Sequence, residues 1–219
     1  ELSLRCRPKA ASLGKGIVAE TESIYRQLVE LLRLEGGDGA HAIQETAFFH
    51  NIVADLPPFL DARARTTRGI GAYTPASIFV EQPPLDGVAT GEAPGDVPCG
   101  GTPAVEILVR AVIPNPETSY VVWGESVPTR CGCMLCADLE ARCLLLGGQK
   151  HVVAGNVFGA PGAPFDESFN MFEVAADLLR REGMDFRSVV RTGIYLRDMD
   201  RDYGELNRAR RKFFHENGV

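Results

Sequence analysis

The sequence predicts an α+β protein built from two copies of one unit, each a β-sheet with two helices packed on one face. The first observation is an internal repeat, because sliding the 219-residue chain by 147 positions carries residues 31–65 onto residues 178–212 without a gap. The second is that apolar residues recur at helical spacing in two segments of each copy. The third is a run of β-branched and aromatic residues between those segments.

Identical residues carry the repeat, so it does not depend on composition alone. The identical pairs are Leu31/Leu178, Leu32/Leu179, Arg33/Arg180, Glu35/Glu182, Gly36/Gly183, Asp38/Asp185, Asp55/Asp202, Ala62/Ala209 and Arg63/Arg210. Apolar positions match as well, as at Phe59 and Leu206. The chain is therefore interpreted as a duplication.

Each copy is predicted to hold a helix, a strand and a second helix in that order. A glycine, Gly36 or Gly183, ends the first helix of each copy. The predicted bounds, first copy then second, are 20–34 and 166–181 for the first helix, 42–49 and 189–196 for the strand, and 55–65 and 202–215 for the second helix.

Further strand-like segments lie outside this shared part. In the first copy they are residues 75–82 and 105–114, on either side of a Pro- and Gly-rich stretch at 83–103 that is interpreted as a long surface loop. In the second copy they are residues 120–123 and 143–148, which precede its first helix.

A domain boundary is predicted in the turn-like sequence that follows Pro114. We therefore expect a first unit at residues 1–117 and a second at residues 118–219. The second stops before the two strands that close the first, so we expect it to be incomplete. Its missing strands lie beyond the ordered part, or residues 1–7 or a partner chain supply them.

Charge and hydropathy narrow the class of function. The formal net charge of -6 opposes binding to a polyanion outside a local basic patch, so nucleic acid is not an expected partner. A basic cluster, Arg208 with residues 210–212, is interleaved with acidic residues and is typical of a solvated helix face. No apolar run approaches the roughly 20 residues that cross a bilayer. We expect a soluble, cytoplasmic protein.

Three of the six cysteines, Cys131, Cys133 and Cys136, stand close together. Thiols at this spacing could share a zinc ion, with Cys143 as a fourth ligand. The paired second half of a zinc motif is missing, however, and no secretion signal places the chain in an oxidising compartment. We therefore expect free thiols, no metal and no cofactor.

Several segments of the sequence resemble segments of a known protein family. In the second copy they are residues 145–149, 189–199 and 206–214; in the first, residues 45–49 and 75–81 carry the resemblance more weakly. Together with the order β, β, α, β, α, β, β, they resemble the YjgF/YER057c/Rid family, also named endoribonuclease L-PSP, as a tandem duplication. The resemblance implies chorismate-mutase-like units and a homotrimer, or a pseudo-symmetric arrangement of tandem units, with small-molecule pockets at the interfaces.

The resemblance also implies a chemistry and a set of site residues. Members hydrolyse imines and enamines to ketones and ammonia, and an arginine holds the substrate carboxylate while a glutamate positions water. Here Ala76 occupies the arginine position and Leu108 the glutamate position, with Glu106 two residues earlier on the same face. We therefore expect Glu106 and Arg110 to be catalytic, with Arg110 supplying the missing charge. The substrate-binding residues are expected to be Ser77, Gly148 and Asn207.

Three functions stay open at this stage. The first is a hydrolase or deaminase that acts on a small carboxylated metabolite. The second is a non-catalytic small-molecule-binding or regulatory trimer, which the loss of the arginine at Ala76 favours. The third is a ribonuclease, which would need a basic groove, or a hydrolase similar to the chorismatases, which join two such units.

Overall fold

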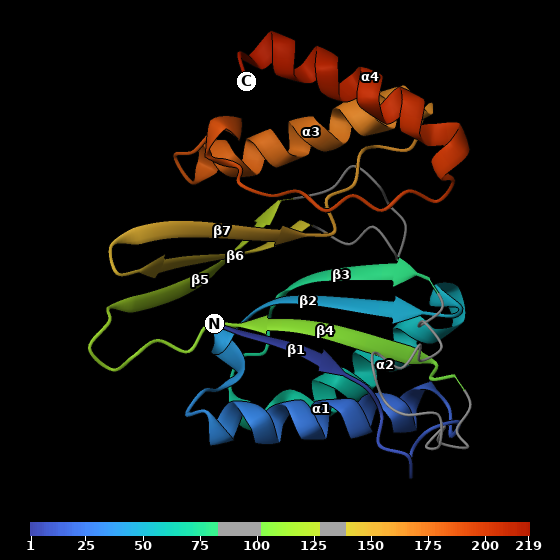
Figure 1. Cartoon of the computed structure of the whole chain (residues 1–219), viewed down its shortest axis with the longest axis vertical. Helices are drawn as coiled ribbons and strands as arrows, with labels where there is room; N and C mark the ends of the chain where they lie inside the picture. The colour runs from blue at the N-terminus through green and yellow to red at the C-terminus, as the bar shows by residue number, and fades with distance from the viewer. Residues whose placement is uncertain (83–101, 128–138) are drawn as a thin grey trace, which may run out of the picture. The chain divides into compact units, whose positions relative to one another are not determined.

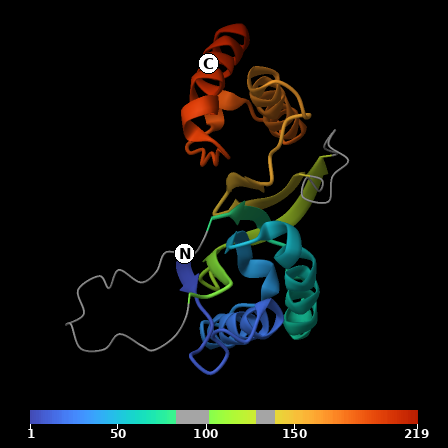
Figure 2. The ribbon, with the colours of Figure 1, turned by 90° about the vertical axis from the view of Figure 1, so that its right-hand side faces the viewer.

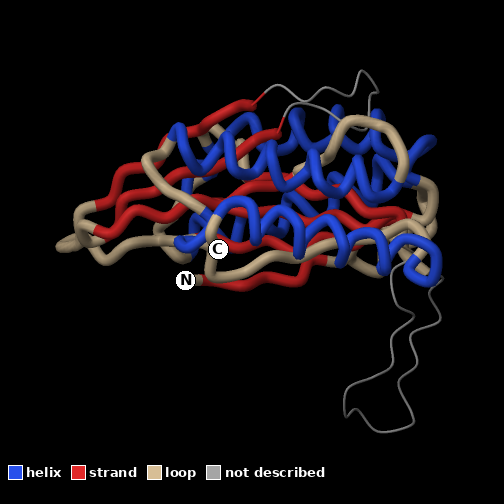
Figure 3. The backbone as a smooth tube through the Cα atoms, turned by 90° about the horizontal axis from the view of Figure 1, so that it is seen from above, coloured by secondary structure: helices blue, strands red, loops and turns tan. Residues whose placement is uncertain are grey.

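The computed structural model describes residues 1–82, 102–127 and 139–219, and its helices and strands confirm the predicted α+β class (Figure 3). The described chain divides into two compact units. Unit 1 is Glu1–Val122 with Leu145–Gln149, and unit 2 is Trp123–Leu144 with Lys150–Val219. The boundary predicted between residues 117 and 118 stays a prediction. The predicted loop at 83–103 falls almost entirely outside the described ranges.

Unit 1 holds a four-stranded sheet with two long helices on one face (Figure 1). Its elements are β1 (Leu2–Cys6), α1 (Ile17–Leu34), η1 (Gly39–His41), β2 (Ala42–Phe49), α2 (Ile52–Thr67), η2 (Arg68–Ile70), β3 (Ala76–Glu81) and β4 (Val105–Ala111). The strand order is β1-β4-β2-β3, in which β4 is antiparallel to both neighbours and β2 is parallel to β3. The first strand of the chain therefore pairs with the last strand of the unit.

Aromatic rings fill the layer between the helices and the sheet of unit 1. The helices α1 and α2 pack side by side below the strands (Figure 2). Phe59 of α2 is fully buried, and its ring lies 5.0 Å from that of Phe49 and 5.9 Å from that of Tyr25. Because side chains alternate along a strand, Glu45 and Phe49 of β2 face the helices while Gln44 faces the other side.

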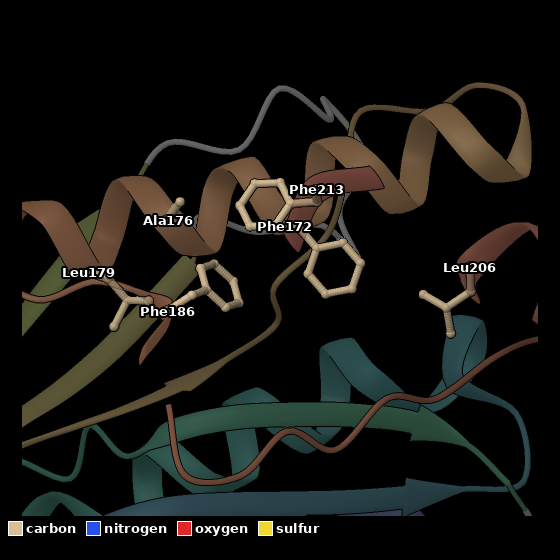
Figure 4. Packing of buried hydrophobic residues seen from close by; sticks show 6 residues of the cluster. All are labelled: Phe172, Ala176, Leu179, Phe186, Leu206 and Phe213. Carbon is tan, nitrogen blue, oxygen red and sulfur yellow. The ribbon is translucent and has the colours of Figure 1, made fainter. Parts of the chain in front are cut away.

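Unit 2 combines a three-stranded sheet with a second pair of helices. Its elements are β5 (Tyr120–Val127), β6 (Leu139–Leu146), β7 (Gln149–Gly155), α3 (Pro164–Arg181), η3 (Phe186–Ser188) and α4 (Met199–Asn217). The strands lie in the order β5-β6-β7. A cluster of buried apolar side chains joins the two helices (Figure 4). Its members are Phe172, Ala176, Leu179, Phe186, Leu206 and Phe213.

The bounds of the elements follow the same shift of 147 positions that the sequence shows. Ile17–Leu34 maps onto Pro164–Arg181, and the two short turns at Gly39–His41 and Phe186–Ser188 coincide under it. Each turn begins after an aspartate, Asp38 or Asp185, whose carboxylate accepts a hydrogen bond from the main chain. Capping of this kind is local, so the same residues give the same turn in both units.

The strand predicted at residues 189–196 is wrong, because the structure assigns no strand there. Its counterpart in unit 1, β2, lies between β4 and β3 and is buried along most of its length. In the described part of unit 2 no strand flanks this segment. Val190 is accordingly fully exposed, whereas the equivalent Ile43 is 3% exposed. Strand composition specifies a pleated surface, but a strand forms only where a partner supplies hydrogen bonds.

Two strands were not predicted as such. β1 falls in residues 1–7, which were considered only as a donated strand, and β7 falls in a stretch predicted to be rich in turns. β1 has only five residues, too few for its alternation of apolar and polar residues to be a strong signal, and the sequence of β7, QKHVVAG, does not alternate. The other predicted helices and strands are confirmed within a few residues at each end.

Candidate functional site

The face of the unit 1 sheet opposite the helices carries the polar residues of β4. Its odd-numbered residues Val105, Ile107 and Val109 are buried toward the helices, so Glu106 and Arg110 point to the other face. The pairing with β1 places Arg5 directly opposite Leu108. Charged residues that are distant in the sequence therefore meet on this face.

Two arginines of the N-terminal segment bind the carboxylate of Glu106, and we call Arg5, Arg7 and Glu106 the arginine–glutamate cluster. Arg5 donates from Nε to Oε1 and from Nη2 to Oε2, the latter at 3.1 Å. Arg7 donates from Nε to Oε2 at 2.6 Å. Glu106 is only 5% exposed. Its carboxylate therefore accepts the three hydrogen bonds at a nearly buried position.

The arginine–glutamate cluster keeps an excess of positive charge at the surface. The hydrogen bond to Glu106 raises the pKa of Arg5 above its ordinary value, so Arg5 stays charged. The side chains of Arg5 and Arg7 are 53% and 37% exposed. A guanidinium has five N–H donors, and Arg5 directs two of its five to Glu106. The arrangement can therefore receive a second carboxylate from solvent.

Arg110 lies on the same face but belongs to a separate group. Its guanidinium donates to Glu1 Oε1 at 2.7 and 3.0 Å and to Gln44 Oε1 at 3.2 Å. The hydrogen bond and the charge of Arg110 lower the pKa of Glu1. Four residues along a strand span about 13 Å, so Arg110 and Glu106 have different partners. The structure places both predicted catalytic residues on one face without bringing them into contact.

Ser77 faces the opposite side of the sheet, where it joins a buried network. Its hydroxyl accepts a hydrogen bond from Arg63 Nη1 at 3.1 Å and donates to the carbonyl of Pro75 at 3.2 Å. Since Ser77 is buried beneath the helices, it does not share a face with Glu106. The predicted substrate-binding role of Ser77 and the predicted catalytic role of Glu106 thus belong to two sides of one sheet.

The network around Ser77 is centred on the fully buried carboxylate of Glu45. Tyr25 and Tyr73 donate their hydroxyls to Glu45 Oε2 at 2.6 and 2.7 Å, and Arg63 Nη1 contacts Oε1 at 2.6 Å. Burial, and then the charge of Glu45, raise the pKa of both tyrosines well above the ordinary value. Burial alone would lower the pKa of Arg63, but the charge of Glu45 outweighs it and the pKa is raised. The result is an ion pair with neutral tyrosines.

Gly148 and Asn207 occupy a turn and a helix. Gly148 lies between β6 and β7 with φ of 84°, a left-handed conformation that glycine adopts without strain. Asn207 lies on α4, where its Oδ1 accepts a hydrogen bond from Arg210 Nη2 at 2.7 Å. Their predicted roles in substrate binding remain predictions.

In the described part of unit 2, a polar cluster that the sequence analysis missed is centred on Glu182. Lys150 Nζ donates to the main-chain carbonyl of Glu182 at 2.9 Å and to its Oε2 at 3.0 Å, and Trp123 Nε1 lies 3.4 Å from its Oε1. Burial would raise the pKa of Glu182, but the hydrogen bonds from Lys150 and Trp123 outweigh it and the pKa is lowered. Burial, and then the charge of Glu182, raise the pKa of Cys143 to about 12.

Arg5 and Arg7 are the functional candidates that sequence reasoning overlooked. The signal for them was present in the alternation of residues 2–7, where Leu2, Leu4 and Cys6 stand at every second position. This alternation predicts a strand with one apolar and one basic face. The pairing with Glu106 had no signal in the sequence, because 101 positions separate Arg5 from its partner.

The described ranges give no support for a metal site, since they contain no group of three potential ligands. The cysteines at 131, 133 and 136 lie outside those ranges. Cys6 and Cys143 are free thiols. Burial, and then the charge of Glu45, raise the pKa of Cys6 to about 11. None of the helices in the described ranges is both long enough and apolar enough to span a bilayer.

No family model matches the sequence, and no curated protein matches it. Solved structures do match, over about half of the chain. They are members of the YjgF family. One is a YjgF/YER057c/UK114 family protein from Mycobacterium tuberculosis, 20% identical, covering 50% of this chain and 75% of that one with a TM-score of 0.34.

Two other matching structures come from Neisseria meningitidis and Yersinia pestis. The first is a YjgF family protein, 20% identical, which covers 51% of this chain and 77% of its own with a TM-score of 0.36. The second is a Rid family protein of unknown function, 18% identical, which covers 52% of this chain and 80% of its own with a TM-score of 0.35.

Proposed function

We propose that unit 1 binds a small carboxylated molecule at the arginine–glutamate cluster. The observation that carries this proposal is the pair of half-exposed guanidinium groups fixed on one side by a nearly buried carboxylate. Glu106 orients both arginines and so lowers the entropy that they would lose on binding a ligand. A planar carboxylate is the expected partner for the N–H donors of Arg5 that Glu106 does not accept.

The same face offers an apolar surface for the rest of the ligand. Leu108 is 39% exposed and lies opposite Arg5 in the sheet, while Phe48 lies opposite Glu106. A small metabolite with one carboxylate and a short hydrocarbon part fits this combination of charge and apolar surface.

Hydrolysis of an imine or enamine is the second candidate function. The observation that favours it is that a glutamate and two guanidinium groups occupy one face of the sheet. However, Glu106 is only 5% exposed and its carboxylate already accepts three hydrogen bonds from Arg5 and Arg7, so little of it is open to a water molecule. Binding without catalysis therefore ranks above hydrolysis.

Binding is tested by titrating the full chain with short 2-oxo acids and monitoring the heat released. Arg5→Ala should weaken binding at least about tenfold, since a charge-assisted hydrogen bond contributes about 1.5–3 kcal/mol. Arg26→Ala is the matched control, because Arg26 is an exposed arginine paired with a glutamate on α1. Equal affinity of the parent and the Arg5→Ala variant would contradict the proposal.

Hydrolysis is tested by measuring ammonia release from imines that are generated in situ from amino acids. If the chain is a hydrolase, Glu106→Gln should abolish release even at substrate concentrations that saturate the variant. If the parent binds 2-oxo acids but releases no ammonia above the blank, the function is binding alone.

We also infer a homotrimer in the cytoplasm, on the basis of the resemblance and of the free thiols at Cys6 and Cys143. Three chains of 23.8 kDa would give a mass of about 71 kDa in light scattering. A mass of one chain at micromolar concentration would exclude the trimer.

A further inference from the structure

A further arginine, Arg110, lies beside the arginine–glutamate cluster on the same face of the unit 1 sheet. Arg5 of β1 pairs directly with Leu108 of β4. Arg110 is two residues further along β4, so its side chain is on the same face as that of Leu108. Diagonal neighbours of this kind on adjacent strands are about 7–8 Å apart. Arg5 and Arg110 are therefore both neighbours of the partly exposed Leu108.

The guanidinium of Arg110 is oriented by two acceptors, much as that of Arg5 is oriented by Glu106. Gln44, which lies opposite Arg110 in β2, accepts a hydrogen bond from Nη1 at 3.2 Å. Glu1 accepts from Nη2 at 2.7 Å and from Nε at 3.0 Å. A side chain that is already oriented loses less entropy when it binds a ligand.

The ion pair of Glu1 with Arg110 is the part of this surface that a ligand can replace. Both hydrogen bonds end on Oε1 of Glu1, so the contact lacks the two parallel bonds, one to each oxygen, of the strongest arginine–carboxylate pairs. The side chains of Arg110 and Glu1 are 42% and 54% exposed. An exposed ion pair of this kind adds little stability, so a ligand carboxylate displaces Glu1 at small cost.

The charges of these ion pairs leave an excess of positive charge on the face. Three arginines, Arg5, Arg7 and Arg110, are paired with two glutamates, Glu1 and Glu106. Once Glu1 leaves Arg110, only Glu106 opposes the three arginines. A ligand with two negative charges then balances the remaining positive charge.

We propose that the ligand of unit 1 is a short dicarboxylate, with one carboxylate on Arg5 and the other on Arg110. This inference rests on the proposed binding of a carboxylated molecule at the arginine–glutamate cluster, and it names the class of that molecule. The first carboxylate contacts the N–H donors of Arg5 that Glu106 does not accept. The second replaces the side chain of Glu1 on Arg110. The hydrocarbon part between them lies over Leu108, which is 39% exposed.

The test compares two ligands that differ only at one end. 2-Oxoglutarate has a second carboxylate where 2-oxopentanoate has a methyl group, and each is titrated into the full chain by calorimetry at equal ionic strength. 2-Oxopentanoate leaves the pair of Glu1 with Arg110 in place. We expect 2-oxoglutarate to bind about tenfold more tightly, because its second carboxylate gains charge-assisted hydrogen bonds.

Removing Arg110 should abolish this preference. We expect the ratio of the two dissociation constants to fall to about one in Arg110→Gln, whose fold is checked by circular dichroism. Arg26→Gln is the matched control, because it also removes a glutamate-paired arginine that is exposed, but on α1. Its ratio should equal that of the parent. A preference that survives in Arg110→Gln would place the second carboxylate elsewhere and overturn the proposal.

Removing the charge of Glu1 should have the opposite effect. We expect Glu1→Gln to tighten the binding of 2-oxoglutarate roughly threefold, because the competing carboxylate is lost, and to change that of 2-oxopentanoate less. Glu30→Gln alters the net charge equally at an exposed position of α1 and is the control. Unchanged or weaker binding of 2-oxoglutarate to Glu1→Gln would contradict the exchange of carboxylates on Arg110 and the proposal with it.

The parent chain separates this proposal from the binding function on which it rests. Saturable binding of both acids with equal affinity would overturn the dicarboxylate and leave carboxylate binding intact. Absence of binding of either acid at millimolar concentration would overturn both.

Discussion

One buried carboxylate, that of Glu45, connects both helices of unit 1 to its sheet. It accepts hydrogen bonds from Tyr25 of α1 and Arg63 of α2, and it belongs to β2. A buried ion pair costs much desolvation, and here several hydrogen bonds offset that cost. The position in unit 2 that corresponds to Glu45 is Thr192, so the network has no counterpart there.

Replacing Glu45 should destabilise unit 1 because it leaves Arg63 and two tyrosine hydroxyls without their acceptor. We expect Glu45→Ala to lower the free energy of unfolding by about 3–5 kcal/mol and Glu45→Gln to lower it less. Urea unfolding followed by circular dichroism measures both. Glu30→Ala, which changes an exposed residue of α1, is the control and should lie within about 0.5 kcal/mol of the parent.

The stability of unit 2 should depend on pH through Glu182. Its pKa is lowered in the folded state, so the unfolded chain binds the proton more readily. The contribution is therefore complete above the unfolded pKa of about 4.3 and is lost as the pH falls through the lower, folded pKa. We expect Glu182→Gln to flatten the acid limb of a plot of unfolding midpoint against pH. An unchanged acid limb would mean that Lys150 does not stabilise the carboxylate.

At the scale of elements, α2 is a helix whose interior contains two prolines, a residue type that disfavours helical hydrogen bonding. Pro57 and Pro58 lie inside Ile52–Thr67, where proline cannot donate to the carbonyl four residues earlier and crowds it. The helix is held at its start by Asn51, whose side chain accepts a hydrogen bond from the N–H of Ala54 at 3.1 Å. Further along the helix, packing of Phe59 against Phe49 of the sheet offsets part of the cost of the prolines.

Substituting the exposed Pro57 should stabilise the protein. We expect Pro57→Ala to raise the free energy of unfolding by about 1–2 kcal/mol, because the regained hydrogen bond exceeds the loss of stiffness in the unfolded chain. Pro116→Ala, in an exposed turn, is the matched control and should be neutral or slightly destabilising. Both are measured from urea midpoints, and a drop in stability for Pro57→Ala would show that the helix depends on the restricted main chain of Pro57.

Local patterns predicted the helices, whereas pairing between strands could not be predicted. The apolar spacing of α1 and α3 and the glycines after them lie within a few residues of each other in the sequence. The contact of Arg5 with Glu106 depends on the register of β1 against β4, which no local pattern encodes. For the same reason, residues 189–196 have the composition of a strand without forming one in this structure.

At the scale of the whole molecule, each unit has a core of its own. Unit 1 is centred on Tyr25, Phe49 and Phe59, and unit 2 on Phe172, Phe186 and Phe213. Units with separate cores can unfold in separate steps.

Thermal unfolding should therefore show two transitions that respond to different substitutions. We expect Phe59→Ala to lower the midpoint temperature of the transition that belongs to unit 1. Phe213→Ala should lower the midpoint of the transition that belongs to unit 2. Each shift should correspond to a loss of about 3–5 kcal/mol in the free energy of unfolding. Differential scanning calorimetry distinguishes them. One transition that moves equally with both variants would show that the units unfold together.

The pairing of β1 with β4 also sets an order of events during synthesis. Leu2 lies opposite Ala111, so 109 further residues must be translated after Leu2 before its partner exists. At about 5–20 residues per second, this takes about 5–20 s. From the translation of Thr67 until that of β4, the ribosome carries a nascent chain that holds both helices and β2 but lacks β4, the strand between β1 and β2. Chaperones that recognise unpaired strands would meet this chain before β4 emerges.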